Sequence, residues 1–241
     1  TSVARCLRTC GWARSLEPSQ RHMSGGSVGE KWRNAWADPG FRQACWVGLA
    51  AVLPVVVLLP KFFSLLGTRP GLVPPDPVLD RVGPYAVALP IFLVLYTAVL
   101  VGIVLLLRKP EAMVRMLHAY TLLLAFRMVA MFLITFEPPA GIIPLVDPVT
   151  SVFYPGQEPF LKDLFFSGHT ATPFLFALAV GPGAARRWLM VSAAVVGALV
   201  VVQHVHYTVD VLAAPVFAVL AWWLAGRSVS RCGLNPSAEG A

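Results

Sequence analysis

The stretch YAVALPIFLVLYTAVLVGIVLLL, residues 85–107, contains no charged side chain. About 20 mainly apolar residues in a helix cross the hydrocarbon core of a bilayer. A chain inside lipid must also pair its backbone amides and carbonyls internally, which a helix does. The run lacks the alternation of polar and apolar residues that marks the strands of a membrane barrel. We therefore predict that residues 85–107 form a transmembrane helix.

Five further apolar runs of similar character follow along the chain. They cover residues 45–66, 116–136, 167–180, 188–205 and 207–225. Together the six runs predict an all-α, polytopic membrane protein with six transmembrane helices. The predicted parts are an N-terminal segment at 1–43, a six-helix membrane domain at 44–226 and a C-terminal tail at 227–241.

The overall composition agrees with a membrane protein. The chain is 57% hydrophobic and only 13% charged, whereas soluble domains have about 25% charged residues. Its mean hydropathy is +0.70. The net charge of +7 does not indicate nucleic-acid binding, because the Lys and Arg residues lie in short linkers between the apolar runs.

The charges between the runs set the expected orientation. With six spans, the side that carries both termini and the linkers 108–115 and 181–187 holds 14 Lys and Arg residues, against 4 on the other side. The ratio is 10 against 4 if the chain starts at Met23. Because Lys and Arg concentrate on the cytoplasmic side, we expect cytoplasmic termini and outward-facing loops at 67–84 and 137–163.

The first 22 residues differ from the rest of the chain. They are basic, contain no apolar run and precede Met23, so we expect that Met23 is the native start. An Arg-rich mitochondrial transit peptide is the alternative. The texture of the whole chain, rich in Ala, Val, Gly and Arg, suggests a bacterial inner membrane protein.

Several titratable residues fall within or beside the apolar runs. They are Arg127, His169, His204, His206 and Asp210. Such groups are costly inside a bilayer, so they are functional candidates by default. The predicted topology places all of them near the outer face, which structural polar residues scattered at random would not do.

The spacing of His206 and Asp210 has chemical meaning. If residues 206–210 are helical, the two side chains share one face. The carboxylate can then accept the Nδ1 proton of the imidazole, fix its tautomer and direct Nε2 outward. An imidazole activated in this way is a competent nucleophile toward phosphorus.

The residues Ser167-Gly168-His169-Thr170 open another predicted helix. Free backbone amides and the helix dipole at such a position favour a phosphate oxygen. His169 there suits general acid–base catalysis. Arg127 can offer a planar fork of donors to a phosphoryl group.

Simpler explanations exist for single residues. His118 is expected to be a packing residue, and Arg127 alone could be a buried ion-pair partner. His204, His206 and Asp210 could instead ligate a metal. The combination of several such groups at one face favours a phosphate-chemistry site.

Four segments resemble the motifs of sphingomyelin synthases, which belong to the type 2 phosphatidic acid phosphatase superfamily. The segment from Asp163 to Thr170 (DLFFSGHT) is similar to the third motif, and that from His204 to Val211 (HVHYTVDV) to the fourth. Residues 127–135 resemble the second motif, and Pro74-Pro75-Asp76-Pro77 partly resembles the first.

This resemblance implies transfer of a phosphorylated head group from a phospholipid donor to a lipid acceptor such as ceramide. It implies that His206 is the nucleophile, that Asp210 activates it, and that His169 protonates the departing diacylglycerol. No metal, cofactor or nucleic acid is implied. The residues expected to contact the phosphate are Arg127, Ser167, Gly168, Thr170 and Tyr207, with Asp163 and His204 in support.

Three alternatives remain at this point. Water could replace the lipid acceptor, which would make the protein a lipid phosphatase. The protein could be a non-catalytic transporter or assembly factor, in which case loss of His206 need not abolish its activity. A metal-dependent intramembrane hydrolase would instead be sensitive to chelators.

Overall fold

The computed structural model describes residues 26–146 and 161–234, and helices dominate both parts. The predicted extension at 1–22 and part of the loop 137–163 lie outside the described residues. The helices are α1 (Val28–Ala37), α2 (Pro39–Gly67), α3 (Ala88–Leu106), α4 (Pro110–Leu133), α6 (Gly168–Val180), α7 (Ala184–Val202) and α8 (Thr208–Arg231), with a short 3-10 turn at Leu79–Arg81. The predicted all-α fold is confirmed.

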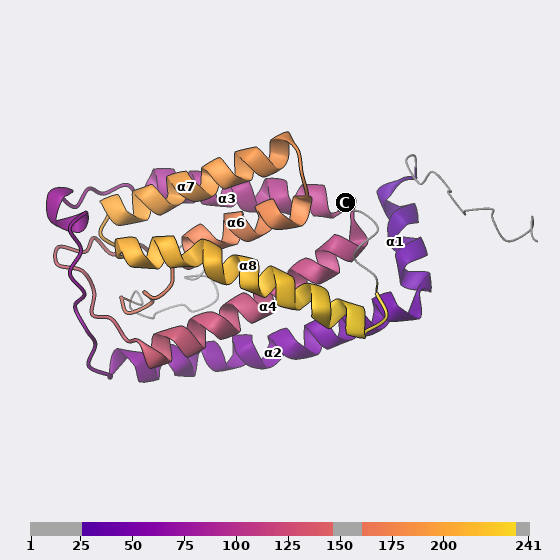
Figure 1. The fold of residues 1–241 in the computed structure, drawn as a ribbon, viewed down its shortest axis with the longest axis horizontal. Coiled ribbons are helices and arrows are strands. Elements are labelled where there is room, and N and C mark those ends of the chain that lie inside the picture. Colours follow the sequence, from indigo (N-terminus) through magenta and orange to yellow (C-terminus); the bar gives the residue numbers. More distant parts are fainter. Residues whose placement is uncertain (1–25, 147–160, 235–241) are drawn as a thin grey trace, which may run out of the picture.

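Five of the helices, α2, α3, α4, α7 and α8, are long and apolar enough to cross a membrane. The sixth predicted span is α6, which has only 13 residues. At 1.5 Å per residue it is about 20 Å long, shorter than the ~30 Å core of a bilayer. Figure 1 shows this short helix between α7 and α8. Of the six predicted spans, five are thus long apolar helices in the described residues, and the sixth is a short apolar helix.

A capping residue explains why α2 begins before the apolar run predicted at 45–66. The Asp38 side chain accepts a hydrogen bond from Gly40 N at 2.9 Å, and Pro39 occupies the first position of α2. The preceding helix, α1, was not predicted, because it is short and mainly polar. Its start is capped by Ser27, and it lies across the end of the bundle (Figure 1).

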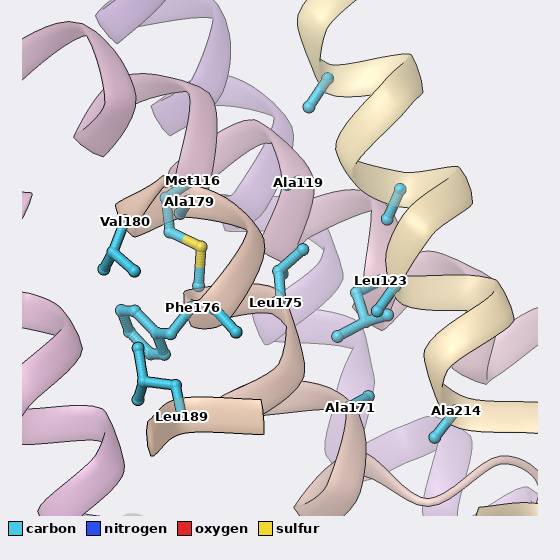
Figure 2. Close-up of a cluster of buried hydrophobic side chains, with 14 of the residues drawn as sticks. Met116, Ala119, Leu123, Ala171, Leu175, Phe176, Ala179, Val180, Leu189 and Ala214 are labelled. Atoms are coloured by element: carbon cyan, nitrogen blue, oxygen red, sulfur yellow. The ribbon is translucent and has the colours of Figure 1, made fainter. Parts of the chain in front are cut away.

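The core of the bundle is built around α6. Its side chains Leu175 and Phe176 are buried between Leu123 of α4, Leu189 of α7 and Ala214 of α8 (Figure 2). The short helix is thus surrounded by the long ones, and its first turn is held inside the bundle.

A row of alanines on α8 lets the helices approach closely. The four residues are fully buried at helical spacing: Ala214, Ala218, Ala221 and Ala225. Small residues are typical of helix contacts in membranes, where close packing stabilises association.

Helix α2 has the most exposed apolar surface. Leu53 and Val57 are 64% and 62% exposed, and the helix packs mainly against α4 at the edge of the bundle (Figure 1). A contiguous exposed apolar face of this kind is not stable in water. It fits contact with lipid, so the structure supports an integral membrane protein.

The two ends of the bundle are different. We call the end with residues 68–87, 134–146 and 203–207 the loop end, and the end with α1 and the last turn of α8 the terminal end. At the loop end, Leu72 N donates to Thr135 O at 2.8 Å and Ile143 N to Gln203 O at 3.3 Å. These bonds join connections that are far apart in the sequence into one layer over the bundle.

Candidate active site

His206 and Asp210 meet at the start of α8. His206 Nδ1 lies 3.3 Å from Asp210 Oδ2, which also accepts a hydrogen bond from Tyr207 N at 3.1 Å. The expected contact is therefore present, but His206 precedes the helix instead of lying in it. Tyr207 has an extended backbone (φ −72°, ψ 156°), and α8 begins at Thr208. An imidazole that donates from Nδ1 keeps the lone pair on Nε2.

Both side chains of this pair are fully buried. Among the described residues, His206 Nε2 and Asp210 Oδ1 have no hydrogen-bond partner. Most buried polar atoms in proteins are paired, so an exception needs an explanation. An imidazole nitrogen that keeps its lone pair unused can act as a nucleophile.

His169 lies in the first turn of α6, next to this pair. The ring centroids of His169 and His206 are 5.8 Å apart, with the rings inclined at 62°. Ser167 N donates to the backbone oxygen of Asp210 at 3.1 Å, which ties the start of α6 to that of α8. The structure thus brings together the three residues predicted to be catalytic, from the starts of α6 and α8, which lie about 40 residues apart in the sequence.

Arg127 of α4 reaches the same place and pairs with Asp163. Its guanidinium lies directly over Gly168, where a Cβ atom would come within 1.8 Å of Arg127 Nη1. Burial tends to raise the pKa of Asp163, but the charge of Arg127 and its hydrogen bond hold this pKa below its usual value. Asp163 is therefore an anion that fixes one edge of the guanidinium.

Three of the residues expected to contact phosphate have their side chains engaged elsewhere. Ser167 Oγ caps α6 and accepts hydrogen bonds from Thr170 N at 3.3 Å and Thr170 Oγ1 at 3.2 Å. The Tyr207 hydroxyl donates to Glu137 O at 3.0 Å. Phosphate binding by these residues stays a prediction, and it requires their backbone amides or a rearrangement of their side chains.

His204 lies apart from the pair. Its ring nitrogens are 3.0 Å from Ala140 O and 2.6 Å from Val82 O, so the side chain links two loops. Its φ of 57° turns the chain between α7 and His206. In the described parts of the chain, no group of three His, Cys, Asp or Glu side chains is placed to hold a metal ion.

The site forms one end of a cavity of about 920 Å³. Arg127, Asp163, Gly168 and His169 line this end, whereas the rest of the wall is mainly apolar. His206 is fully buried and is not among the residues that line the cavity.

Two polar contacts of the loop end were not predicted. Lys162 Nζ pairs with Glu137 Oε1 at 2.8 Å and donates to Arg69 O at 2.7 Å. Asp76, noted only as part of a motif, caps α8 from 132 residues away. Its Oδ2 accepts from Thr208 N at 2.6 Å and its Oδ1 from Thr208 Oγ1 at 3.0 Å. Long-range pairs of this kind leave no periodic signal in a sequence.

Replacement of Asp76 by alanine is expected to destabilise the protein by about 1–2 kcal/mol, because a helix N-cap is lost. Thermal unfolding in detergent would measure this loss. Asp80 is exposed on the neighbouring 3-10 turn, so Asp80→Ala is the matched control with little expected effect. Equal losses in the two variants would contradict the capping role.

The contribution of Asp76 should depend on pH. Burial raises the pKa of this carboxyl, but hydrogen bonds from Thr208, Leu79 and Val78 lower it more, so the pKa lies below its usual value. A depressed pKa gives stability above the unfolded value that is lost as the pH falls through the folded value. The gap between wild type and Asp76→Ala should therefore shrink in acid, and a gap that is constant down to acid denaturation would contradict this.

Comparison with known proteins supports the assignment of the site to phosphate chemistry. No curated protein matches the chain significantly. Residues 162–227 match the family described as PAP2 superfamily C-terminal. The match includes Asp163, His169, His206 and Asp210, and members of this superfamily are phosphatases and phosphotransferases. This segment of the chain therefore supports the resemblance to the type 2 phosphatidic acid phosphatase superfamily.

Proposed function

We propose that the protein is a membrane lipid phosphotransferase that moves a phosphorylated head group, of the phosphocholine type, from a glycerophospholipid to a lipid alcohol such as ceramide. The observation that carries the proposal is the geometry of His206. Its Nδ1 lies against Asp210, and its buried Nε2 has no partner among the described residues. His169 and Arg127 lie beside it at the polar end of an apolar cavity.

In the first half-reaction, His206 Nε2 attacks phosphorus and the bond from phosphorus to the diacylglycerol oxygen breaks. His169 starts protonated and gives its proton to that oxygen, so diacylglycerol leaves as a neutral alcohol. Asp210 stabilises the positive charge that develops on the His206 ring. Arg127 provides donors for the charged oxygens of the phosphoryl group.

In the second half-reaction, the acceptor hydroxyl gives its proton to His169, which is now neutral. The acceptor oxygen attacks phosphorus, the bond from phosphorus to Nε2 breaks, and His206 returns to its initial state. His169 thus acts as the general acid in the first half-reaction and as the general base in the second.

The surroundings favour a lipid acceptor over water. His206 has no exposed surface, and the cavity beside it is lined mainly by apolar side chains. The ring of His169, which lines the cavity, lies 5.8 Å from the ring of His206 between centroids. A lipid that fills the cavity can exclude water during phosphoryl transfer.

The proposal also includes location. The concentration of Lys and Arg at the terminal end supports cytoplasmic termini and a site near the outer face. The composition supports a bacterial inner membrane as the host.

The test uses purified protein in phosphatidylcholine vesicles that contain a fluorescent ceramide, with release of diacylglycerol and of inorganic phosphate followed in parallel. We expect a fluorescent phospholipid and an equal amount of diacylglycerol. Phosphate or phosphocholine released without a fluorescent phospholipid would favour the phosphatase alternative. Absence of turnover with every phospholipid donor would contradict both, and would favour a transporter or assembly factor.

A further inference from the structure

The cavity that begins at the site extends along the bundle toward the terminal end. Its side walls come from α2, α3, α4 and α6, and α1 lines its far end. On α3 the lining residues, Leu95, Tyr96, Val99 and Ile103, share one face at helical spacing. On α4 the lining residues extend from Met131 near the loop end to Met113 near the terminal end. The cavity is therefore elongated, and we call it the groove.

The groove is longer than one leaflet of a bilayer. Arg127 and Met113 are fourteen residues apart on α4, which corresponds to about 21 Å at 1.5 Å per residue. Half of a bilayer core is about 15 Å thick. A chain that starts at Arg127 and follows the groove therefore passes the middle of the membrane.

The two ends of the groove have different chemistry. Arg127, Asp163 and His169 line the end at the site, and Trp32 and Trp36 of α1 line the other. A ligand that matches this arrangement carries a phosphate at one end and hydrocarbon along the rest of its length.

Helix α1 holds the two tryptophans in fixed positions. Trp32 Nε1 donates to Leu107 O at 2.8 Å. Both indole rings contact Phe41 edge-on, with centroid distances of 6.1 Å for Trp32 and 5.9 Å for Trp36. The groove thus ends at aromatic rings whose positions are set by packing and a hydrogen bond.

The side wall of the groove can adapt to the shape of a bound chain, whereas the end at the two tryptophans is fixed. Four of the six methionines in the chain line the groove: Met113, Met116, Met128 and Met131. Methionine has an unbranched, flexible side chain that fits irregular shapes. Such a wall tolerates bends in a hydrocarbon chain, whereas the tryptophans limit its length.

We propose that the groove holds one hydrocarbon chain of the substrate lipid, that its length makes the enzyme favour long chains, and that α1 sets the longest chain that fits. The proposal rests on the function proposed above and adds the determinant of chain length. Burial of each further methylene group along the groove stabilises the complex, until the chain reaches Trp32 and Trp36. Ile103, on the lining face of α3 near this end, is the position at which a larger side chain would shorten the groove.

The test compares Ile103→Trp with Val104→Trp. Val104 is the next residue and has a similar exposure, 48% against 40% for Ile103, but only Ile103 lines the groove, so Val104 is the matched control. For a dipalmitoyl donor, Ile103→Trp is expected to lower kcat/KM about tenfold, as loss of contact for about two methylene groups predicts. For a dioctanoyl donor, both variants should stay within about twofold of wild type. Equal effects of Ile103→Trp on both donors, or no effect on either, would overturn the proposal.

A second measurement does not depend on turnover. A phosphatidylcholine with a photoreactive group at the tip of one long chain would be bound to His206→Ala protein in nanodiscs, and its adducts mapped by mass spectrometry. We expect adducts near Ile103 and Trp32. Labelling mainly at outward-facing positions of α2, such as Leu53, would mean adventitious bilayer lipid only and would overturn the proposal.

Together, the two measurements distinguish a failure of the groove proposal from a failure of the proposed phosphotransferase activity. Labelling at the groove tip in a protein that turns over no donor would support the groove and contradict the enzyme. Turnover without chain-length discrimination by Ile103→Trp would support the enzyme and contradict the groove.

Discussion

Replacement of His206 by alanine is expected to lower the rate of head-group transfer on the order of 10⁴- to 10⁶-fold, as loss of a catalytic nucleophile does in other enzymes. The proposed reaction needs a lone pair at Nε2, and Asp210 fixes the tautomer that provides it. Asp210→Asn keeps the shape but removes the charge, so a smaller loss, about 10²- to 10⁴-fold, is expected. Initial rates in phosphatidylcholine vesicles would measure both effects.

His118 provides the control for this experiment. It is also a buried histidine, but its ring nitrogens contact Ser228 Oγ at 2.9 Å and Ala44 O at 2.8 Å, away from the site. His118→Ala is expected to lower stability by about 1–3 kcal/mol because buried partners lose their hydrogen bonds. Its rate per folded molecule should remain close to that of wild type. An equal loss of rate in His118→Ala and His206→Ala would contradict a specific role for His206.

Trapping of the intermediate would identify the nucleophile directly. With a donor labelled in its phosphate, wild-type protein quenched at alkaline pH should carry label on His206, and His206→Ala should carry none. His169 lines the cavity whereas His206 does not, so the opposite result has a clear meaning. If the label persists in His206→Ala and disappears in His169→Ala, then His169 and not His206 is the nucleophile.

The long helices could be predicted from the sequence because bilayer thickness sets their length. Residues 85–107 carry no charge, and the structure has α3 at Ala88–Leu106. An apolar run does not include the polar cap before it, so α2, which is capped by Asp38, starts earlier than the predicted residue 45. The run 167–180 predicts a sixth span, but its helix has only 13 residues and begins after the cap at Ser167.

The site was predictable where contacts are local. The spacing of His206 and Asp210 predicted their contact, although the backbone between them is extended before α8 begins. The link from Asp76 to Thr208 was not predictable, because it depends on how the loop after α2 crosses the bundle. The same holds for Arg127, whose pairing with Asp163 joins α4 to the segment before α6.

Replacement of Gly168 by alanine is expected to lower activity about 100-fold without unfolding the protein. An added Cβ would lie 1.8 Å from Arg127 Nη1 and 2.7 Å from its Cζ. Since the end of an arginine side chain can move, the helix accommodates the methyl group and the guanidinium is displaced. A displacement of about 1 Å of a group that positions substrate costs on the order of 10²-fold in rate. Activity and thermal unfolding of the same preparation would separate this effect from loss of the fold.

A suitable control is Gly67→Ala, at the last residue of α2, where an added Cβ meets no atom within 4 Å. The decisive comparison is made in the background of Arg127→Ala. If Gly168 is needed only because Arg127 lies over it, then Gly168→Ala should cost nothing further once that side chain is gone, and the two effects will not add. Full additivity would show that the glycine acts on the site by another route, such as contact of the phosphate with the backbone at the start of α6.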